Sequence, residues 1–214
     1  TFTSTIDGAQ TLTLLAGQGD VSVGGAIGGT TDLTGLTAVG NTVSVVAIST
    51  ASGAVALTGT NGVTLGGDIA TDDGGAAAAA AVTVTGPTTL TAGVAIDAHG
   101  TGTGADVTID GTVDGGATLS IDAGTAGDVD LRGVVGGTTA LTSVTVSESN
   151  TTRMVGVTTT GSQAYTSDAG ITLQGTYETS NSSFDINAAV AAADVTLSGD
   201  TLSNTGSGAG NIDF

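Results

Sequence analysis

Apolar and polar residues alternate in short runs along the chain, and the runs end at Gly, Asp or Thr. Residues 11–15, 21–23, 43–46 and 82–84 are examples. An alternation of period two is typical of a β-strand that has one buried and one exposed face. The 3.6-residue period of an amphipathic helix does not compete with it in this sequence. We therefore predict an all-β protein made of short strands.

The spacing of one set of apolar positions indicates how these strands are arranged. Valines recur at nearly regular intervals: Val21, Val43, Val63, Val82, Val107 and Val129. A coil of about 20–25 residues, which is the spacing of this series, is what a β-solenoid needs to bring one strand onto the next, about 4.8 Å away. We predict a parallel β-helix of about ten coils, roughly 48 Å long.

The sequence is also a tandem repeat. Residues 1–37 return, with changes, as residues 107–145. Asp7 corresponds to Asp114 and Leu12 to Leu119, and after a single inserted residue Val21 corresponds to Val129. Repeats of this kind pack on their neighbours and do not form separate cores. We therefore expect two repeats, residues 1–107 and 108–214, in one continuous rod that is cut from a longer tandem array.

Both ends of the chain fall inside predicted strands. Thr1 and Phe2 at one end and residues 212–214 at the other continue the strand pattern without a capping segment. An open coil exposes unpaired backbone groups that can pair with another chain. We expect head-to-tail stacking along the rod axis, in a longer polypeptide or between subunits, through Thr1, Phe2, Ile212 and Phe214.

The apolar member of each alternating run is expected to face the interior of the rod. The apolar residues are mostly Ala, Val, Leu and Ile, whose small or β-branched side chains suit narrow stacked layers. The predicted core comprises Val21, Val43, Val63, Val107, Leu119, Val129, Leu131, Leu141, Ile171, Leu173 and Val195.

Composition narrows the classes of function. Lysine is absent, and 20 Asp and Glu against two Arg give a net charge of −18. Such a charge repels nucleic acid and anionic membrane surfaces. The longest apolar run, residues 76–82, is too short to span a membrane. Because there is no cysteine, disulfides and thiolate metal sites are excluded. We expect neither a nucleic-acid partner nor direct membrane insertion.

Few residues suggest catalysis. His99 is the single histidine and stands in a predicted turn, so a serine nucleophile would have only this one imidazole as a base. Two Arg, two Tyr and no Trp supply little of the groove that carbohydrate cleavage needs. We expect no enzymatic activity and no cofactor.

Carboxylates are the more interesting candidates for binding. Several lie at or beside Gly-rich corners, where hard oxygen ligands can surround Ca²⁺. The candidate Ca²⁺ ligands are Asp106, Asp110, Asp114, Asp128 and Asp130. The alternative, which we take as the default, is that they are solvated corner residues.

Three further features concern the surface. The repeats differ most near residues 71–81 and 178–193, where we expect loops that protrude from the rod. Asn150 and Asn181 each begin an N-glycosylation triplet. Thr-rich steps such as residues 83–85 are similar to the Thr arrays of ice-binding solenoids, but Thr does not return at one fixed phase in every coil. No continuous Thr plane is predicted.

Two stretches carry a resemblance to a known family. Residues 137–144 (GTTALTSV) and residues 157–173 (VTTTGSQAYTSDAGITL) resemble the Gly/Thr/Ala-rich β-strand repeats of giant bacterial surface proteins, the filamentous-haemagglutinin-like and autotransporter-type adhesins. Residues 48–60 of the first repeat do not match this sequence pattern. The resemblance implies a secreted, right-handed parallel β-helix that serves as a stalk or fibre and has no catalytic residues.

These observations lead to one expected function and one alternative. We expect a structural segment of an extracellular or cell-surface filament protein. The alternative is an adhesive module whose loops near residues 71–81 and 178–193 bind host or cell-surface glycans. A Ca²⁺-binding and an ice-binding solenoid stay open as minor alternatives.

Overall fold

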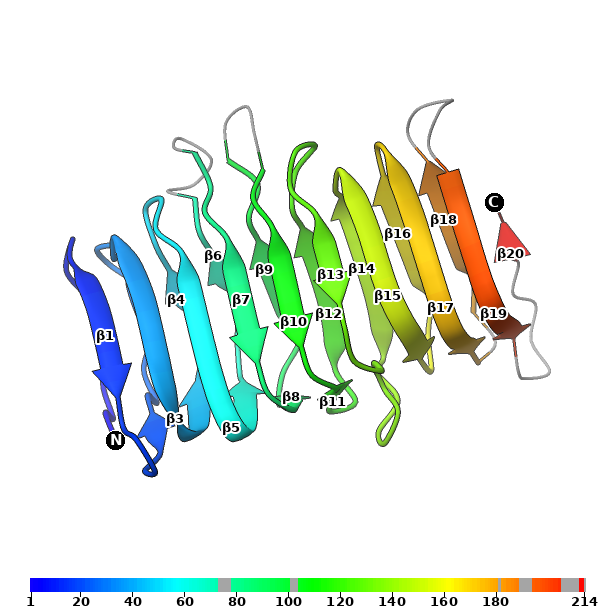
Figure 1. Cartoon of the computed structure of the whole chain (residues 1–214). Coiled ribbons are helices and arrows are strands. Elements are labelled where there is room, and N and C mark those ends of the chain that lie inside the picture. The colour runs from blue at the N-terminus through cyan, green and yellow to red at the C-terminus, as the bar shows by residue number, and fades with distance from the viewer. Residues whose placement is uncertain (73–77, 101–103, 181, 189–193, 205–211, 214) are drawn as a thin grey trace.

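The computed structural model describes residues 1–72, 78–100, 104–180, 182–188, 194–204 and 212–213. These residues form a parallel β-solenoid, in which each turn of the chain lies beside the next along one axis (Figure 1). Every strand pair between the named strands is parallel, and no helix occurs in the described part of the chain. The predicted fold class is confirmed.

The strands form two sheets. The first sheet contains β1 (Thr11–Leu15), β2 (Val21–Ser22), β3 (Gly35–Val45), β5 (Val55–Leu65), β7 (Val82–Thr85), β8 (Thr88–Leu90), β10 (Val107–Asp110), β11 (Val113–Asp114), β13 (Val129–Leu131), β15 (Thr151–Thr158), β17 (Gly170–Thr179) and β19 (Asp194–Asn204). The second sheet contains β4 (Ile48–Ser49), β6 (Ile69–Ala70), β9 (Val94–Asp97), β12 (Thr118–Asp122), β14 (Ser143–Glu148), β16 (Gln163–Ser167), β18 (Phe184–Ala188) and β20 (Ile212–Asp213).

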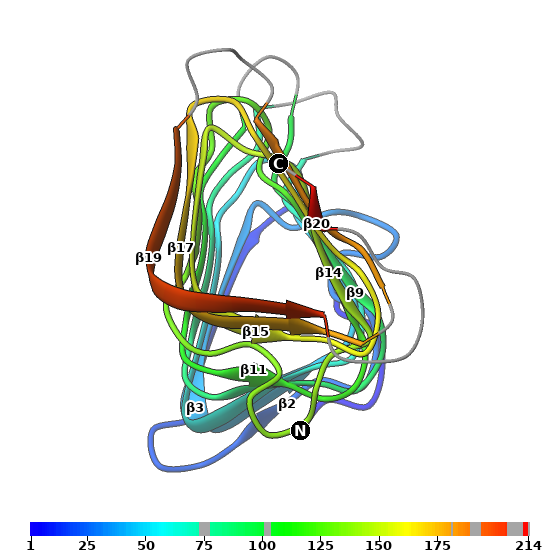
Figure 2. The same ribbon diagram turned by 90° about the vertical axis from the view of Figure 1, so that its right-hand side faces the viewer.

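Viewed along its axis, the rod has three sides (Figure 2). The first sheet covers two of them, because its longest strands bend at a corner. Face 1 comprises β1, β7, β10, β13 and the first halves of β3, β5, β15, β17 and β19. Face 2 comprises β2, β8, β11 and the second halves of those long strands. Face 3 is the second sheet. The chain visits the faces in the order 1, 2, 3.

The rod has fewer turns than the ten expected. The path through face 1 has nine strands, and the eight named strands of face 3 are separated by about seven turns. Isolated bridges at Ile6 and Ile27 extend face 3 by two coils before β4. Some coils are longer than the sequence spacing suggested, because the chain makes excursions between faces. Val55 pairs with Val82, and Val82 pairs with Val107. Both of these steps are longer in sequence than the step from Val43 to its partner Val63.

Identical or similar side chains stack on one another inside the rod. On face 3 the inward position is occupied by Ile in six successive coils and then by Val, Tyr and Ile: Ile6, Ile27, Ile48, Ile69, Ile96, Ile121, Val146, Tyr165 and Ile186. β-Branched residues pack well on a pleated surface, and each coil here covers the one before it. The core therefore consists of columns of stacked side chains, here called ladders, that run along the rod.

The residues predicted to face inward are found in these ladders. The buried ones are Val21, Val43, Val63, Val107, Leu119, Val129, Leu131, Leu141, Ile171 and Leu173. Val195 lies in β19, where the structure describes the backbone but not the side chains.

The valine series that suggested the coil length joins two different ladders. Val21, Val43 and Val63 stack on face 2, and the next residue in that ladder is Thr88. Val82, Val107 and Val129 stack on face 1 above Val55. The step from Val63 to Val82 has the length of a coil but passes from one face to another. Spacing alone could not separate the ladders, because every coil carries apolar residues on all three faces.

The two sequence repeats do not occupy equivalent faces. Residues 11–15 form β1 on face 1, whereas their counterparts, residues 118–122, form β12 on face 3. Ile27 lies on face 3 and its counterpart Val135 on face 2. Val21 lies on face 2 and its counterpart Val129 on face 1. One sequence repeat therefore spans about one third of a turn less than a whole number of turns of the solenoid.

Corner geometry is preserved between the repeats despite this rotation. Gly28 has φ of 75° and its counterpart Gly136 has φ of 72°, a region that L-residues rarely adopt. A Cβ atom would lie 2.1 Å from the Ser49 carbonyl oxygen at Gly28 and 2.1 Å from the Thr158 carbonyl oxygen at Gly136. Glycine is required at both corners because the next coil approaches so closely.

Polar and aromatic side chains enter the core in the later coils. Ser149, Thr152 and Ser167 are buried and join their hydroxyl groups in a ring with O···O distances of 2.6–2.8 Å. Tyr165 donates to the Gln163 side chain over 2.8 Å, and burial raises the pKa of Tyr165 well above its usual range. The alternation pattern gave no sign of these buried polar groups, because Ser and Thr also fill the outward positions.

Candidate functional site

The predicted Ca²⁺ ligands hold corners of neighbouring coils. The Asp128 carboxylate oxygen Oδ1 accepts from the Asn150 side-chain amide at 2.9 Å and from the Thr151 backbone N–H and hydroxyl at 3.0 and 2.7 Å. Asp114 accepts from two successive backbone N–H groups, at residues 138 and 139, over 2.8 and 2.9 Å. Asp106 accepts from the Asp128 backbone N–H at 3.0 Å.

The first repeat has the same caps at equivalent positions. Asp7 accepts from the backbone N–H groups of Thr30 and Thr31, and Asp20 accepts from Thr42 and Asn41. The pKa of Asp7 is lowered mainly by the Thr30 N–H and that of Asp20 mainly by the Thr42 hydroxyl, because these donors favour the ionised carboxyl. Each cap ties a corner to the coil that follows it.

Asp130 is bound by both arginines of the chain. Arg132 Nε and Arg153 Nη1 each lie 2.7 Å from an Asp130 carboxylate oxygen. Partial burial raises the pKa of Asp130, but the hydrogen bonds and charges of the two arginines outweigh it and leave the pKa lowered. Asp110, at the end of β10, is exposed. No described cluster of metal-ligand type includes any of the five candidate carboxylates.

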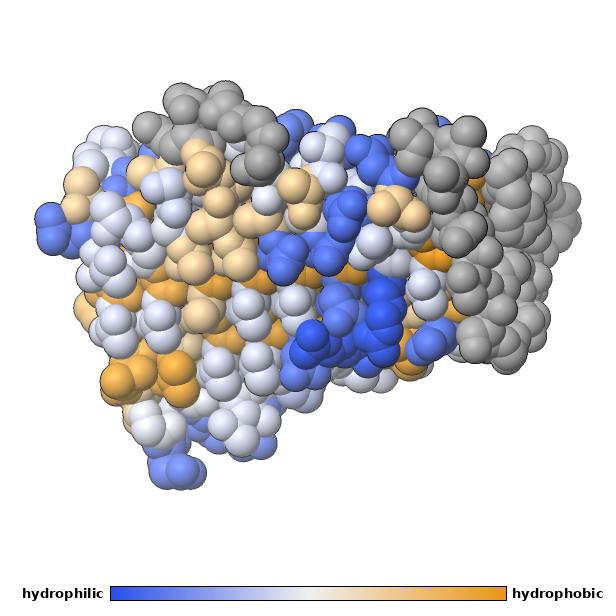
Figure 3. Space-filling model, turned by 45° about the horizontal axis from the view of Figure 1, so that its top comes forward, coloured by the Kyte–Doolittle hydropathy of each residue, from blue (hydrophilic) through white to orange (hydrophobic). Residues whose placement is uncertain are grey.

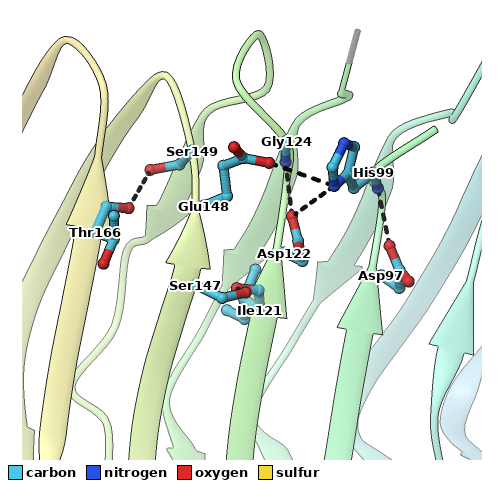
Figure 4. A network of polar contacts seen from close by, with 9 residues as sticks. All are labelled: Asp97, His99, Ile121, Asp122, Gly124, Ser147, Glu148, Ser149 and Thr166. Carbon is cyan, nitrogen blue, oxygen red and sulfur yellow. Dashed lines mark hydrogen bonds and ion pairs between the residues drawn. The ribbon is translucent and has the colours of Figure 1, made fainter. Parts of the chain in front are cut away.

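One cluster of metal-ligand type does occur among the described residues, and it was not predicted (Figure 4). His99 Nδ1 lies 3.5 Å from Asp122 Oδ1 and 3.3 Å from Glu148 Oε2. The three ligand atoms all lie within 4.8 Å of one another. His99, expected to be a solvent-exposed turn residue, is half exposed but faces two carboxylates from the next two coils.

The local fold brings these three side chains together. Asp97, Asp122 and Glu148 are register neighbours at the ends of β9, β12 and β14. The Asp97 carboxylate accepts from the His99 backbone N–H at 3.0 Å, and the His99 ring points toward Asp122 and Glu148 (Figure 4). A register shift between β12 and β14 places Glu148, in place of Ser147, beside Asp122. Such bulges re-aim side chains.

Threonine forms an outward column along part of face 1. Thr13, Thr37, Thr83 and Thr108 occupy one register position, and Ala56 interrupts them. The same column continues with Asp130 and Arg153. Figure 3 shows a strongly hydrophilic area beside rows of hydrophobic side chains near the middle of the view. The column is thus not a continuous Thr plane.

The predicted loops coincide only partly with loops in the structure. Between β6 and β7, the Thr71 hydroxyl donates to the Ala80 carbonyl oxygen and closes the base of the excursion. Within residues 178–193, however, Phe184–Ala188 is strand β18, so the expectation of a loop is wrong for these five residues. Phe184 and Ile186 alternate inward and are buried, which places this segment in face 3. Residues 73–77, 181 and 189–193 lie outside the described residues.

The remaining predicted positions are distributed along the rod. Asn150 is half buried and its amide is engaged with Asp128, whereas Asn181 lies outside the described residues. At the N-terminal end Thr1 is exposed, and Phe2 is 46% exposed and bridges to Val23. Ile212 belongs to β20, and Phe214 is outside the described residues.

Comparisons with protein-family models, with curated proteins and with solved structures find no match. Among the described residues no helix is long and apolar enough to cross a membrane.

Proposed function

We propose that this chain is a non-enzymatic structural segment, a rod that serves as a stalk or fibre in a repetitive protein at the cell surface or outside the cell. The observation that supports this most is what the two repeats share. Asp7 and Asp114 cap corners in the same way, and Gly28 and Gly136 make the same close approach to the next coil. The elements that the two repeats share are thus those that form the corners and let one coil stack on the next.

Charge and composition support an extended role outside the cell. A net charge of −18 keeps a long array soluble. The absence of cysteine fits a chain that is exported before it folds. The continuous ladders of faces 1 and 3 make the coils interdependent, so length can be added coil by coil.

A covalent tandem of two copies tests this role. If coils stack across the junction, the maximum dimension measured by small-angle X-ray scattering increases by about 43 Å for nine added coils. The matched control joins the copies by a flexible Gly-Ser linker and should show a broad distribution of lengths. A direct tandem as flexible as the linker control would refute the stacking stalk.

An adhesive module is the second candidate, and one observation favours it. The connections β6–β7, β9–β10 and β18–β19 all run from face 3 to face 1. These connections therefore share one edge of the rod, where a partner such as a surface glycan could contact several coils together.

Shortening these connections separates the two candidates. Two variants replace residues 72–80 or residues 189–193 by a Gly-Ser turn, and circular dichroism checks that the rod stays folded. Glycan-array and cell-binding assays should then give the same result as for the unchanged chain. Loss of binding by a folded variant would establish the adhesive role and overturn the purely structural one.

A further inference from the structure

The His99–Asp122–Glu148 cluster lies at the edge between face 3 and face 1 and draws one side chain from each of three successive coils. Its exposed fractions are 45% for the His99 side chain and about a third for each carboxylate. All three side chains are therefore partly exposed to solvent.

Two of the three distances between the ligand atoms match the edges of a coordination tetrahedron. Zn²⁺ binds imidazole nitrogen and carboxylate oxygen at about 2.0–2.2 Å, so two ligands of a tetrahedral ion are about 3.3–3.6 Å apart. His99 Nδ1 lies 3.3 Å from the Glu148 oxygen and 3.5 Å from the Asp122 oxygen. Both separations fall in that range.

The two carboxylates at this edge carry negative charges that a bound cation would neutralise. Asp122 and Glu148 are direct register neighbours, and like charges opposite one another destabilise a ladder. His99 Nδ1 faces both acceptors, and a single Nδ1–H can donate fully to only one of them. Both arginines of the chain are bound to Asp130 on face 1. A divalent ion would satisfy all three ligands together.

None of the three ligand side chains is shared by the two repeats, although Asp122 Oδ1 also accepts from the Gly124 backbone N–H at 3.0 Å (Figure 4). Asp122 corresponds to Leu15 in the first repeat, and Glu148 corresponds to Val39, because Leu15 pairs with Val39 as Asp122 pairs with Glu148. Gly124 and its counterpart Gly17 have similar φ values, 66° and 61°. A Cβ on Gly17 would meet nothing within 4 Å, whereas one on Gly124 would lie 3.1 Å from His99 Cδ2. The His99 imidazole thus packs beside the Gly124 corner, at a place that is open beside Gly17 in the first repeat.

We propose that His99, Asp122 and Glu148 bind one divalent transition-metal ion, Zn²⁺, with water completing the coordination. One nitrogen and two oxygen donors suit Zn²⁺, whereas Ca²⁺ takes six to eight oxygen ligands. The bound ion links three successive coils at the base of the β9–β10 connection. Its role is a cross-link in a chain that has no cysteine.

Metal titration of the whole, chelator-treated chain tests this proposal. Isothermal titration with ZnCl₂ should show one high-affinity Zn²⁺ per chain, and a large excess of Ca²⁺ should not displace it. H99Q and E148Q should each weaken binding at least tenfold, as loss of a metal-site partner does elsewhere. The matched control is E178Q, which makes the same chemical change on face 2 and should bind as the unchanged chain does.

A thermal readout guards against a variant that fails to fold. Zn²⁺ should raise the melting temperature of the unchanged chain and of E178Q, because it binds the folded state, and should leave those of H99Q and E148Q unchanged. Equal Zn²⁺ affinity in all four proteins, or displacement by Ca²⁺, would overturn the site. That result would leave the proposed stalk function untouched.

Discussion

Placing a carboxylate in the face 1 ladder provides a quantitative test of the register. Val82 is fully buried between Val55 and Val107, which are also fully buried. Thr83, the next residue, points outward between Ala56 and Thr108. Val82→Asp and Thr83→Asp therefore add the same group to adjacent positions on opposite sides of one strand.

The expected cost of Val82→Asp has two parts. Loss of two buried methyl groups costs about 0.8 kcal/mol each, and the cavity brings the total to about 2–3 kcal/mol. Val82→Ala measures this part alone. The new carboxyl must also stay neutral in the apolar ladder, and at pH 7 this costs about 4 kcal/mol for a group whose ordinary pKa is about 3.9.

The second part depends on pH with a definite sign. Burial raises the folded-state pKa of the new carboxyl, so the unfolded chain releases its proton first and destabilisation grows with pH. Between pH 7 and pH 5 the Val82→Asp variant should regain about 2.7 kcal/mol relative to Val82→Ala. Urea unfolding followed by circular dichroism measures the difference.

Thr83→Asp should change stability by less than about 0.5 kcal/mol, because its side chain meets solvent. If Val82→Asp were as stable as Thr83→Asp, or if its deficit did not change with pH, the assignment of Val82 to the interior would be wrong.

Two other predictions concern the corners. Gly28→Ala should destabilise the rod by more than Gly17→Ala, since both incur the left-handed strain of about 1–2 kcal/mol but only Gly28 would also place a Cβ 2.1 Å from a carbonyl oxygen; equal melting temperatures would contradict the close approach. The lowered pKa values of Asp7 and Asp20 stabilise the fold above their ordinary value of 3.8, and this stability is lost as the pH falls through the folded-state values below it. Asp7→Asn should therefore be less stable than the unchanged chain at pH 7, and the difference should shrink in thermal melts toward about pH 3.

The strands were predictable from sequence because alternation is a local property. The inward direction of Val107 and Ile109 follows from the alternation with their immediate neighbours, without knowledge of the next coil. The number of coils was not predictable to the same degree. It depends on which residues pair across coils, and the long step from Val55 to Val82 contains an excursion that periodicity cannot measure.

Predicting the polar contacts from sequence would also have required knowledge of the strand register between coils. Asp128 was recognised as a corner residue, but its partners Asn150 and Thr151 lie one coil later and could be assigned only from the stacking. The cluster of His99, Asp122 and Glu148 was missed for the same reason. Each member follows the one before it at close to one coil length in sequence. Ligand-type residues separated by a coil length were the signal that could have found it.

The rotation between the repeats affects the mechanics of the rod. A local irregularity fixed at one place in the repeat, such as a wide corner, tilts the axis slightly toward one side. Because residues 11–15 lie on face 1 and their counterparts, residues 118–122, on face 3, the two tilts point in directions about a third of a turn apart. Tilts in one shared direction would add up and curl a repetitive rod into an arc. With this period, the tilts of three consecutive repeats would point toward all three sides in turn and cancel, so a filament could stay straight even if each repeat were bent.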